Sequence, residues 1–180
     1  MRELLGRKTR EKAAQVIQWR HQIHEYPELS FQEFRTADLI EEQLRSFGMD
    51  TIRRIGRSGT GVLAELHGTG SGPDICIGLR ADIDALPIQE QSGVPYASKR
   101  DGIFHGCGHD SHGAILLGTA WLLSDLREHF AGCVKFFFQH AEEELGGGAD
   151  FMEAGVMENP HVDGVMALHA LPDIFVGEIG

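Results

Sequence analysis

The chain has 180 residues, of which 42% are apolar and 24% are charged, and its formal net charge is −11. This length suits one domain whose core is large enough to fold without disulfide bonds. The acidic balance, with no basic stripe to offset it, excludes nucleic acids and anionic membranes as partners.

The sequence also carries signals about its compartment. Its three cysteines are too widely spaced for a disulfide framework, and the basic N-terminus is not followed by the apolar segment of a signal peptide. The apolar run at 114–123 is too short to span a bilayer. The cytoplasm is therefore the expected location.

Apolar periodicity and turn residues predict alternating helices and strands. Helical spacing over 8–25 ends at Pro27, and Ser30 with Glu33 forms the capping-box pattern of a second helix that ends at Gly48. The other expected elements are strands at 51–55, 61–67, 74–80 and 133–139, a helix at 112–128, a helix at 148–155, and strands at 163–169 and 174–179. Strands that alternate with helices indicate an α/β fold with a largely parallel sheet.

The segment FHGCGHDSHG at 104–113 concentrates titratable side chains before the expected third helix. Residues two apart in an extended segment face the same side, so Cys107 and His109 are expected to share a cavity, with room for an ion at Gly108. Asp110 is expected to accept the other imidazole N–H of a ligand. The following helix start is expected to lower the pKa of the Cys107 thiol. The alternative is a structural cysteine beside a capping aspartate and surface histidines.

Three carboxylates, Glu142, Glu143 and Glu144, follow the apolar strand that ends in FFFQ. Ligands bind where strands of an α/β sheet end. Neighbouring extended residues diverge, so one of Glu142 and Glu143 is expected to bind an ion while the other faces a bound water as its base. The glycines at 146–148 allow a sharp turn. The alternative is a solvated acidic loop that leads into a flexible linker.

Two further strands are expected to end in polar side chains. VDGVMALHALP indicates a buried strand that ends at His169, with Pro172 blocking its continuation. Asp82 and Asp84 follow the strand at 74–80 and face the same side, so either is placed to orient a ligand. Taken alone, His169 could equally be a structural histidine in the core or on the surface. Asp82 and Asp84 could equally belong to an ordinary turn at the end of a strand.

Together these segments resemble the dinuclear metallopeptidases of the aminoacylase and carboxypeptidase type, in particular the amidohydrolases that act on N-acyl amino acids, hippurate and indole-acetyl amino acids. The blocks that carry the resemblance are HEYPELSFQE, LRADIDALPI, FHGCGHDSHGAILLG, FFFQHAEEELGGGADFMEAGVMEN and LHALPDIFVGEIG. The resemblance implies a zinc-exopeptidase-like catalytic domain, which is a three-layer α/β sandwich with a largely parallel mixed sheet and helices on both faces.

The resemblance also implies the site. Two divalent ions, Zn²⁺ or Mn²⁺, are expected to be bound by Cys107, His109, Glu143 and His169. Glu142 is implied as the general base, which takes a proton from a water shared by the ions and hands it to the leaving amine of an N-acyl amino acid. Asp84 is expected to orient these groups, and Asp82 and Asp110 to hold ligands in place.

The sequence departs from the family pattern in three ways. His140 stands where family members usually have proline and is expected to place one more donor near the site, and Glu144 adds a third carboxylate. Family members also continue with a lid and dimerisation domain and a returning segment that bears another His ligand. Residues 1–180 are therefore expected to form an incomplete catalytic domain, with a homodimer possible only in a complete member.

Three other interpretations fit the same residues. One is a metal-binding fragment without turnover, which lacks the lid and the last His ligand. Another is an incomplete chain whose apolar sheet edge pairs with a partner segment. The third is a cysteine hydrolase that uses Cys107 with a nearby histidine.

Overall fold

The computed structural model describes residues 1–171, 173–175 and 177–178. Its elements, in chain order, are α1 (Arg2–Glu25), α2 (Phe34–Ser46), β1 (Thr51–Ile55), β2 (Gly61–His67), β3 (Cys76–Asp82), α3 (His109–Ser124), the 3₁₀ helix η1 (Arg127–His129), β4 (Cys133–Gln139), α4 (Gly147–Glu153) and β5 (Gly164–Ala167).

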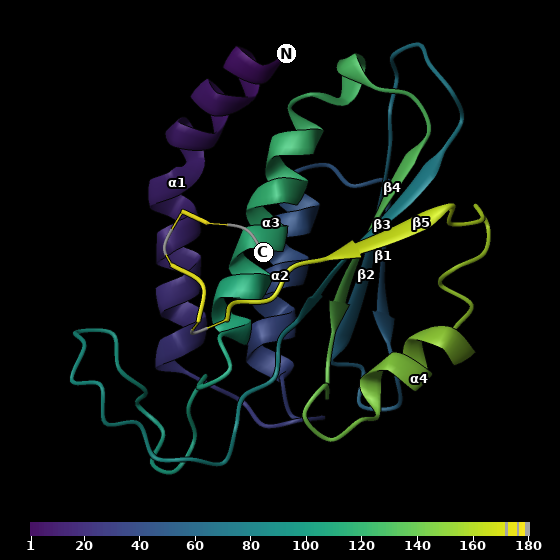
Figure 1. Cartoon of the computed structure of the whole chain (residues 1–180). Coiled ribbons are helices and arrows are strands. Elements are labelled where there is room, and N and C mark those ends of the chain that lie inside the picture. Colours follow the sequence, from purple (N-terminus) through teal and green to yellow (C-terminus); the bar gives the residue numbers. More distant parts are fainter. Residues whose placement is uncertain (172, 176, 179–180) are drawn as a thin grey trace.

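The strands form one mixed sheet in the order β1-β2-β4-β3-β5. β2 pairs antiparallel with both β1 and β4, whereas β3 lies parallel to both β4 and β5. Helices α1, α2 and α3 lie together on one side of the sheet and α4 lies on the other (Figure 1). The expected three-layer α/β sandwich is therefore confirmed, with parallel pairing among the adjacent strands β4, β3 and β5.

Alternating side chains of β4 enter a core on each face of the sheet. Phe136 and Phe138 belong to the larger core, together with Trp19 of α1 and Leu44 of α2. Phe137 points the other way and belongs to the smaller core with residues of α4. A strand buried on both faces has a continuous apolar sequence, which explains the run FFF.

Several predicted boundaries differ from the structure. α1 begins at Arg2 rather than at residue 8, and α3 covers His109–Ser124 rather than 112–128. Of the strand expected at 174–179, the described residues 174, 175, 177 and 178 are not in a strand, and 176 and 179 lie outside the described residues, as does Pro172. The chain leaves the sheet after Ala167 and crosses the start of α3, where the Ala170 N–H donates to a side chain of that helix.

The predicted capping box is wrong. α2 begins at Phe34 with Glu33 as its N-cap residue, and its first free amides donate to Glu28. Ser30 and Glu33 make tertiary hydrogen bonds instead, because the segment before α2 packs against the ends of β3 and β4. Gly48 follows the end of α2 as expected, with a φ of +73°.

No membrane span and no disulfide were expected in the part of the chain that the structure describes. No helix in that part of the chain is long and apolar enough to cross a bilayer. Cys76, Cys107 and Cys133 are all free, although Cys76 and Cys133 are paired residues of the adjacent strands β3 and β4.

Candidate metal centre

The candidate centre lies at the sheet edge where three parallel strands end. β3, β4 and β5 run in the same direction, so the segments that follow them leave the sheet side by side. Asp84 follows β3, Glu142 and Glu143 follow β4, and His169 follows β5. All of them approach the first turn of α3, which begins at His109.

His109 is a buried imidazole held by a carboxylate. Its Nδ1 lies 3.2 Å from Asp84 Oδ1, so Nδ1–H donates to Asp84 and Nε2 is the ring nitrogen left for another partner. Nε2 is buried and has no hydrogen-bond partner among the described residues. Buried polar atoms are normally paired, so an unpaired imidazole nitrogen indicates a place for a ligand. The orienting contact expected of Asp84 is present.

The predicted divergence of Glu142 and Glu143 is wrong, because both residues lie in a turn rather than an extended segment and both carboxylates approach His109 Nε2. Glu143 donates its backbone N–H to Asp84 Oδ2 at 3.0 Å. Its buried Oε1 lies 3.8 Å from His109 Nε2 and has no hydrogen-bond partner in the described part of the chain. Glu142 Oε2 lies 4.0 Å from the same nitrogen, and its side chain is 38% exposed compared with 24% for Glu143. The more enclosed carboxylate faces the imidazole, and the more open one borders solvent.

Cys107 lies in a turn before α3 rather than in the extended segment that was predicted. Gly108 has a φ of +91°, a left-handed conformation that favours glycine, and this turn brings Cys107 beside His109 and Glu143. One donor atom from each of these three side chains lies within 4.8 Å of the others.

The predicted lowering of the Cys107 pKa is wrong for the metal-free protein. Burial, and then the neighbouring charge of Glu143, raise the pKa of the thiol to about 11. The start of α3 does not offset these effects. A bound cation is what would hold the thiolate form here.

His169 reaches the centre from the segment after β5. Its Nε2 lies 3.4 Å from Cys107 Sγ, and its Nδ1–H donates to the Ala170 carbonyl at 2.8 Å. A second group of donor atoms within 4.8 Å of one another comes from Asp82, His109, His112 and His169. The two groups share His109 and together contain all four ligands that the sequence predicts.

Asp82 supports the centre through a histidine. Its Oδ1 accepts a hydrogen bond from His112 Nδ1 at 2.6 Å, its Oδ2 accepts one from Arg80 at 2.7 Å, and Oδ2 lies 3.6 Å from His109 Nε2. Burial opposes ionisation, but the His112 hydrogen bond and the nearby cationic groups lower the pKa of Asp82 to about 2. Asp82 is therefore a carboxylate at neutral pH.

Asp110 does not contact the His109 imidazole, so this expectation is wrong. Its Oδ2 accepts hydrogen bonds from His24 Nδ1 at 2.8 Å and from Arg20 Nε at 3.0 Å. The reason is that both residues lie in α3, where successive side chains are rotated by about 100°. Asp110 consequently faces α1, on the side away from the donor cluster.

His112 was not predicted as part of the site. Besides its bond to Asp82, its Nε2 accepts the backbone N–H of Ala170 at 2.9 Å, which fixes the segment that carries His169. The available signal was spacing, because residues three apart on a helix share a face and His109 begins α3.

The two departures from the family pattern add no donor to the centre. His140 is fully buried, but its Nε2 pairs with Asp150 of α4 at 3.0 Å and its ring packs against Phe31. Glu144 is exposed. The glycine turn after them is required, because a Cβ at Gly147 would collide with the His140 carbonyl oxygen.

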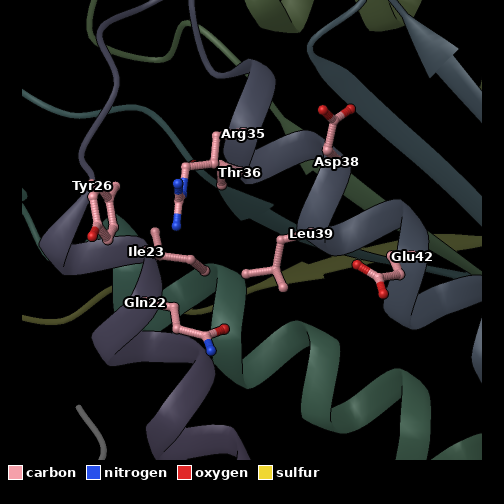
Figure 2. Close-up of a pocket in the computed structure, with 8 residues that line it drawn as sticks. All are labelled: Gln22, Ile23, Tyr26, Arg35, Thr36, Asp38, Leu39 and Glu42. Atoms are coloured by element: carbon pink, nitrogen blue, oxygen red, sulfur yellow. The ribbon is translucent and has the colours of Figure 1, made fainter.

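A separate pocket of about 230 Å³ lies between α1 and α2 (Figure 2). Ile23 and Leu39 form its apolar part, and the Arg35 guanidinium lies 3.8 Å from the centre of the Tyr26 ring. None of the candidate donor residues lines it. The candidate site is therefore at the sheet edge, where buried polar atoms lack partners.

The donor set at the sheet edge fits divalent metal ions. A thiol, imidazoles and carboxylates are the ligands that Zn²⁺ and related ions take in proteins. His109 Nε2 and Glu143 Oε1 are both buried and have no hydrogen-bond partner within the described residues. A cation between them would satisfy both atoms.

Comparisons with known proteins agree with this arrangement. Residues 78–180 match the model of Peptidase family M20/M25/M40. An N-acyl-L-amino acid amidohydrolase from Geobacillus stearothermophilus is 45% identical over 180 residues, which cover 99% of this chain and 47% of the relative. A hippurate hydrolase from Campylobacter jejuni is 44% identical over 153 residues, which cover 85% of this chain and 38% of the relative.

A solved structure of an M20 peptidase also resembles this chain in fold and sequence. A dinuclear metal-binding peptidase of the M20 family from Bacillus subtilis has a TM-score of 0.81 and 45% identity, covering 89% of this chain and 43% of that chain. This chain thus spans less than half the length of these relatives. Because the family model covers more than half of the chain, from within β3 through both donor groups, the chain belongs to peptidase family M20/M25/M40.

Proposed function

We propose that this chain is the metal-binding part of an amidohydrolase that cleaves the amide bond of N-acyl amino acids such as hippurate. The proposal is carried by two buried atoms, His109 Nε2 and Glu143 Oε1, which lie 3.8 Å apart. Neither atom has a hydrogen-bond partner among the described residues. The substrate class is supported by relatives named N-acyl-L-amino acid amidohydrolase and hippurate hydrolase.

In this proposal two divalent ions are bound by Cys107, His109, Glu143 and His169. The thiolate and imidazoles favour Zn²⁺, and the carboxylates also admit Mn²⁺. The description of the Bacillus subtilis structure as dinuclear supports two ions. Asp84 holds His109 in the tautomer that leaves Nε2 free, as a ligand requires.

When bound, the ions would acidify a water and polarise the substrate carbonyl. Glu142 is the proposed general base, because its carboxylate is partly exposed and lies 4.0 Å from His109 Nε2. It takes a proton from the attacking water and delivers it to the leaving amine nitrogen. One water is consumed, the C–N bond breaks, and a carboxylic acid and a free amino acid are released.

A second candidate function is ion binding without turnover. It is supported by the two groups of donor atoms, which can hold an ion without a general base. A cysteine hydrolase is disfavoured, because burial raises the pKa of Cys107 to about 11 and a thiol nucleophile needs the thiolate.

We also propose that the natural substrate is a small molecule and that the protein works in the cytoplasm. Its three free cysteines support a reducing compartment. A homodimer is proposed only for a complete member of the family.

Metal content per chain tests the proposal most directly. The chain is dialysed against metal-free buffer, loaded with Zn²⁺ or Mn²⁺, freed of excess ion and measured by elemental analysis. We expect two ions per chain, and the same number in a His129→Ala control, because His129 is partly exposed on η1. A folded sample that retains no ion contradicts the proposal. Release of glycine from hippurate then separates the amidohydrolase from the binding-only candidate.

A further inference from the structure

The segment Glu28–Glu33, between α1 and α2, lies against the candidate centre although it contains none of the donors. Its backbone is joined to the end of β3, where the Ala85 N–H donates to the Glu28 carbonyl at 2.8 Å and Leu29 forms an isolated bridge with Ala85. The side chains of Ser30 and Glu33 are buried. They are therefore held next to the segments that carry Asp84, Glu142 and Glu143.

Ser30 acts on the centre through Asp84. Its Oγ–H donates to Asp84 Oδ2 at 2.7 Å, and the same oxygen accepts the Glu143 N–H at 3.0 Å. Asp84 Oδ1 faces His109 Nδ1 at 3.2 Å. A single carboxylate therefore links two proposed ligands, and Ser30 supplies the hydrogen bond that sets its rotation.

Glu33 acts on the turn that presents the catalytic carboxylates. It is fully buried, and its Oε1 accepts the Ala141 N–H at 2.8 Å. Ala141 has a φ of +47°, an uncommon conformation for a residue other than glycine, and its carbonyl accepts the N–H groups of Gly146 and Gly147. Both backbone polar groups of Ala141 are thus hydrogen-bonded directly before Glu142. Burial raises the pKa of Glu33, which favours a neutral side chain at this position.

We propose that Ser30 and Glu33 are positioning residues for the metal centre: Ser30 orients Asp84, which holds His109 and Glu143, and Glu33 holds the turn that presents Glu142 and Glu143. This inference rests on the proposed function and names no new ligand. Loss of a hydrogen-bonding partner behind metal ligands typically weakens metal binding by about 10–100-fold. The effect must differ from a general loss of stability, and the chain offers a matched control.

The control is Glu28, a buried carboxylate of the same segment. It accepts the backbone N–H groups of Arg35 at 3.1 Å and Thr36 at 2.9 Å, so it serves α2 and not the centre. Glu28→Met and Glu33→Met each remove a buried acceptor for backbone amides. Glu33→Gln keeps an oxygen that can accept the Ala141 N–H.

The first experiment measures Zn²⁺ affinity of the whole chain by competition with a chromophoric chelator, together with urea unfolding of each variant. We expect Ser30→Ala and Glu33→Met to bind Zn²⁺ about 10–100-fold more weakly, and Glu33→Gln to bind as the unaltered chain does. Glu28→Met should be less stable but keep its affinity. Unchanged affinity in folded Glu33→Met, or an equal loss in Glu28→Met, overturns the inference.

The second experiment needs no metal, so it separates failure of this inference from failure of the proposed function. Amide ¹H–¹⁵N spectra and hydrogen exchange are recorded for the metal-free chain. Glu33→Met should shift the resonances of Ala141, Glu142 and Glu143 and speed exchange at Ala141, whereas Glu33→Gln and Glu28→Met should not. If the unaltered chain binds no Zn²⁺, the proposed function fails. If the Ala141 amide stays protected from exchange in Glu33→Met, the positioning role of Glu33 fails, whether or not the chain binds Zn²⁺.

Discussion

His24 and His109 are buried histidines that each bond an aspartate, yet their surroundings differ. His24 Nδ1 lies 2.8 Å from Asp110 and its Nε2 lies 3.1 Å from Glu90, so both ring nitrogens are bonded. His109 Nδ1 lies 3.2 Å from Asp84, but its Nε2 has no hydrogen bond among the described residues. We call His24 and Asp110 the closed pair, because both imidazole nitrogens are bonded, and His109 and Asp84 the open pair, because one imidazole nitrogen is left for a ligand.

The closed pair joins three parts of the chain. His24 belongs to α1, Asp110 to α3, and Glu90 to the long connection between β3 and α3. Burial alone would lower the pKa of His24, but its hydrogen bonds to the two carboxylates raise it above the ordinary value. Arg20 adds a bond to Asp110. Because both imidazole nitrogens of His24 are bonded, this network stabilises the packing of the three segments. It also leaves no ring nitrogen of His24 to bind an ion.

At the open pair, carboxylates surround a nitrogen that makes no hydrogen bond to them. Oxygens of Asp82, Glu143 and Glu142 lie 3.6, 3.8 and 4.0 Å from His109 Nε2. Burial alone would lower the pKa of His109, but the Asp84 hydrogen bond and the neighbouring carboxylates raise it, so the position favours a positive charge at Nε2, either a proton or a metal ion. An unsatisfied buried atom does not identify a site by itself, because both ring nitrogens of His105 are also buried without a partner in the described part of the chain; at His109 the unsatisfied nitrogen coincides with a cluster of donor atoms.

The largest effect is expected from Glu142, whose carboxylate lies beside the open pair. Glu142→Gln should lower hippurate turnover by about 10²–10⁴-fold, the usual contribution of a general base, and should leave the metal content unchanged. Glu144→Gln is the matched control, because Glu144 is the exposed neighbour. Hydrolysis is followed by glycine release. Normal turnover of Glu142→Gln would remove Glu142 as the base.

Breaking the closed pair should affect stability and not metal binding. His24→Leu leaves Asp110 and Glu90 without their imidazole donor, and we expect a loss of about 3 kcal/mol in the free energy of unfolding, at the low end for a broken buried pair because Arg20 stays. Urea unfolding measures this loss. His21→Leu, where the ring stacks on Tyr96, should lose less. Loss of bound ions at unchanged stability would reverse the assignment of the two pairs.

Cys107→Ser tests the thiol that lies beside the open pair. Zn²⁺ affinity should fall by more than the roughly 10–100-fold loss that removal of an outer partner causes, because a direct ligand is replaced by a weaker one. Cys76→Ala is the control, since Cys76 starts β3 at the opposite end from the candidate centre. The same chelator competition measures both variants. Equal affinities would exclude the thiolate as a ligand.

The smallest effect per side chain is expected from acid. Asp82 and Asp110 have pKa values of about 2 in the folded chain against an ordinary value of 3.8, so each stabilises the fold by about 2 kcal/mol above pH 3.8. This stability should be lost as the pH falls through about 2. Unfolding in urea between pH 5 and pH 2, with a chelator present, measures it. Asp110→Asn should flatten the curve by its own share, and an unchanged slope would contradict the lowered pKa of Asp110.

Much of the fold and part of the site follow from local sequence. The apolar run at Phe136–Phe138 and the polar residues after it predict a buried strand that ends at a ligand-binding edge. The divergence expected of Glu142 and Glu143 fails, because these residues lie in a turn and both carboxylates approach His109 Nε2. The strand prediction succeeds because it depends on backbone periodicity alone, which does not predict the geometry of a turn.

Partner choices did not follow from the sequence. Ser30 and Glu33 have the spacing of a capping box, but their side chains bond Asp84 and Ala141. Asp110 lies next to His109 in the sequence and yet bonds His24. In each case a contact between segments far apart in the chain replaced the local one, because tertiary packing buries the side chain and requires a partner there.

The sequence by itself determined which residue types stand at the strand ends and at the start of α3, because backbone periodicity and glycine placement are local properties. Only the tertiary structure decided that Asp84 holds His109, that burial raises the pKa of the Cys107 thiol, and that Ser30 and Glu33 stand behind the centre. Hydrogen-bond partners and burial depend on which distant segments meet, and that is decided only when the sheet and its helices pack together.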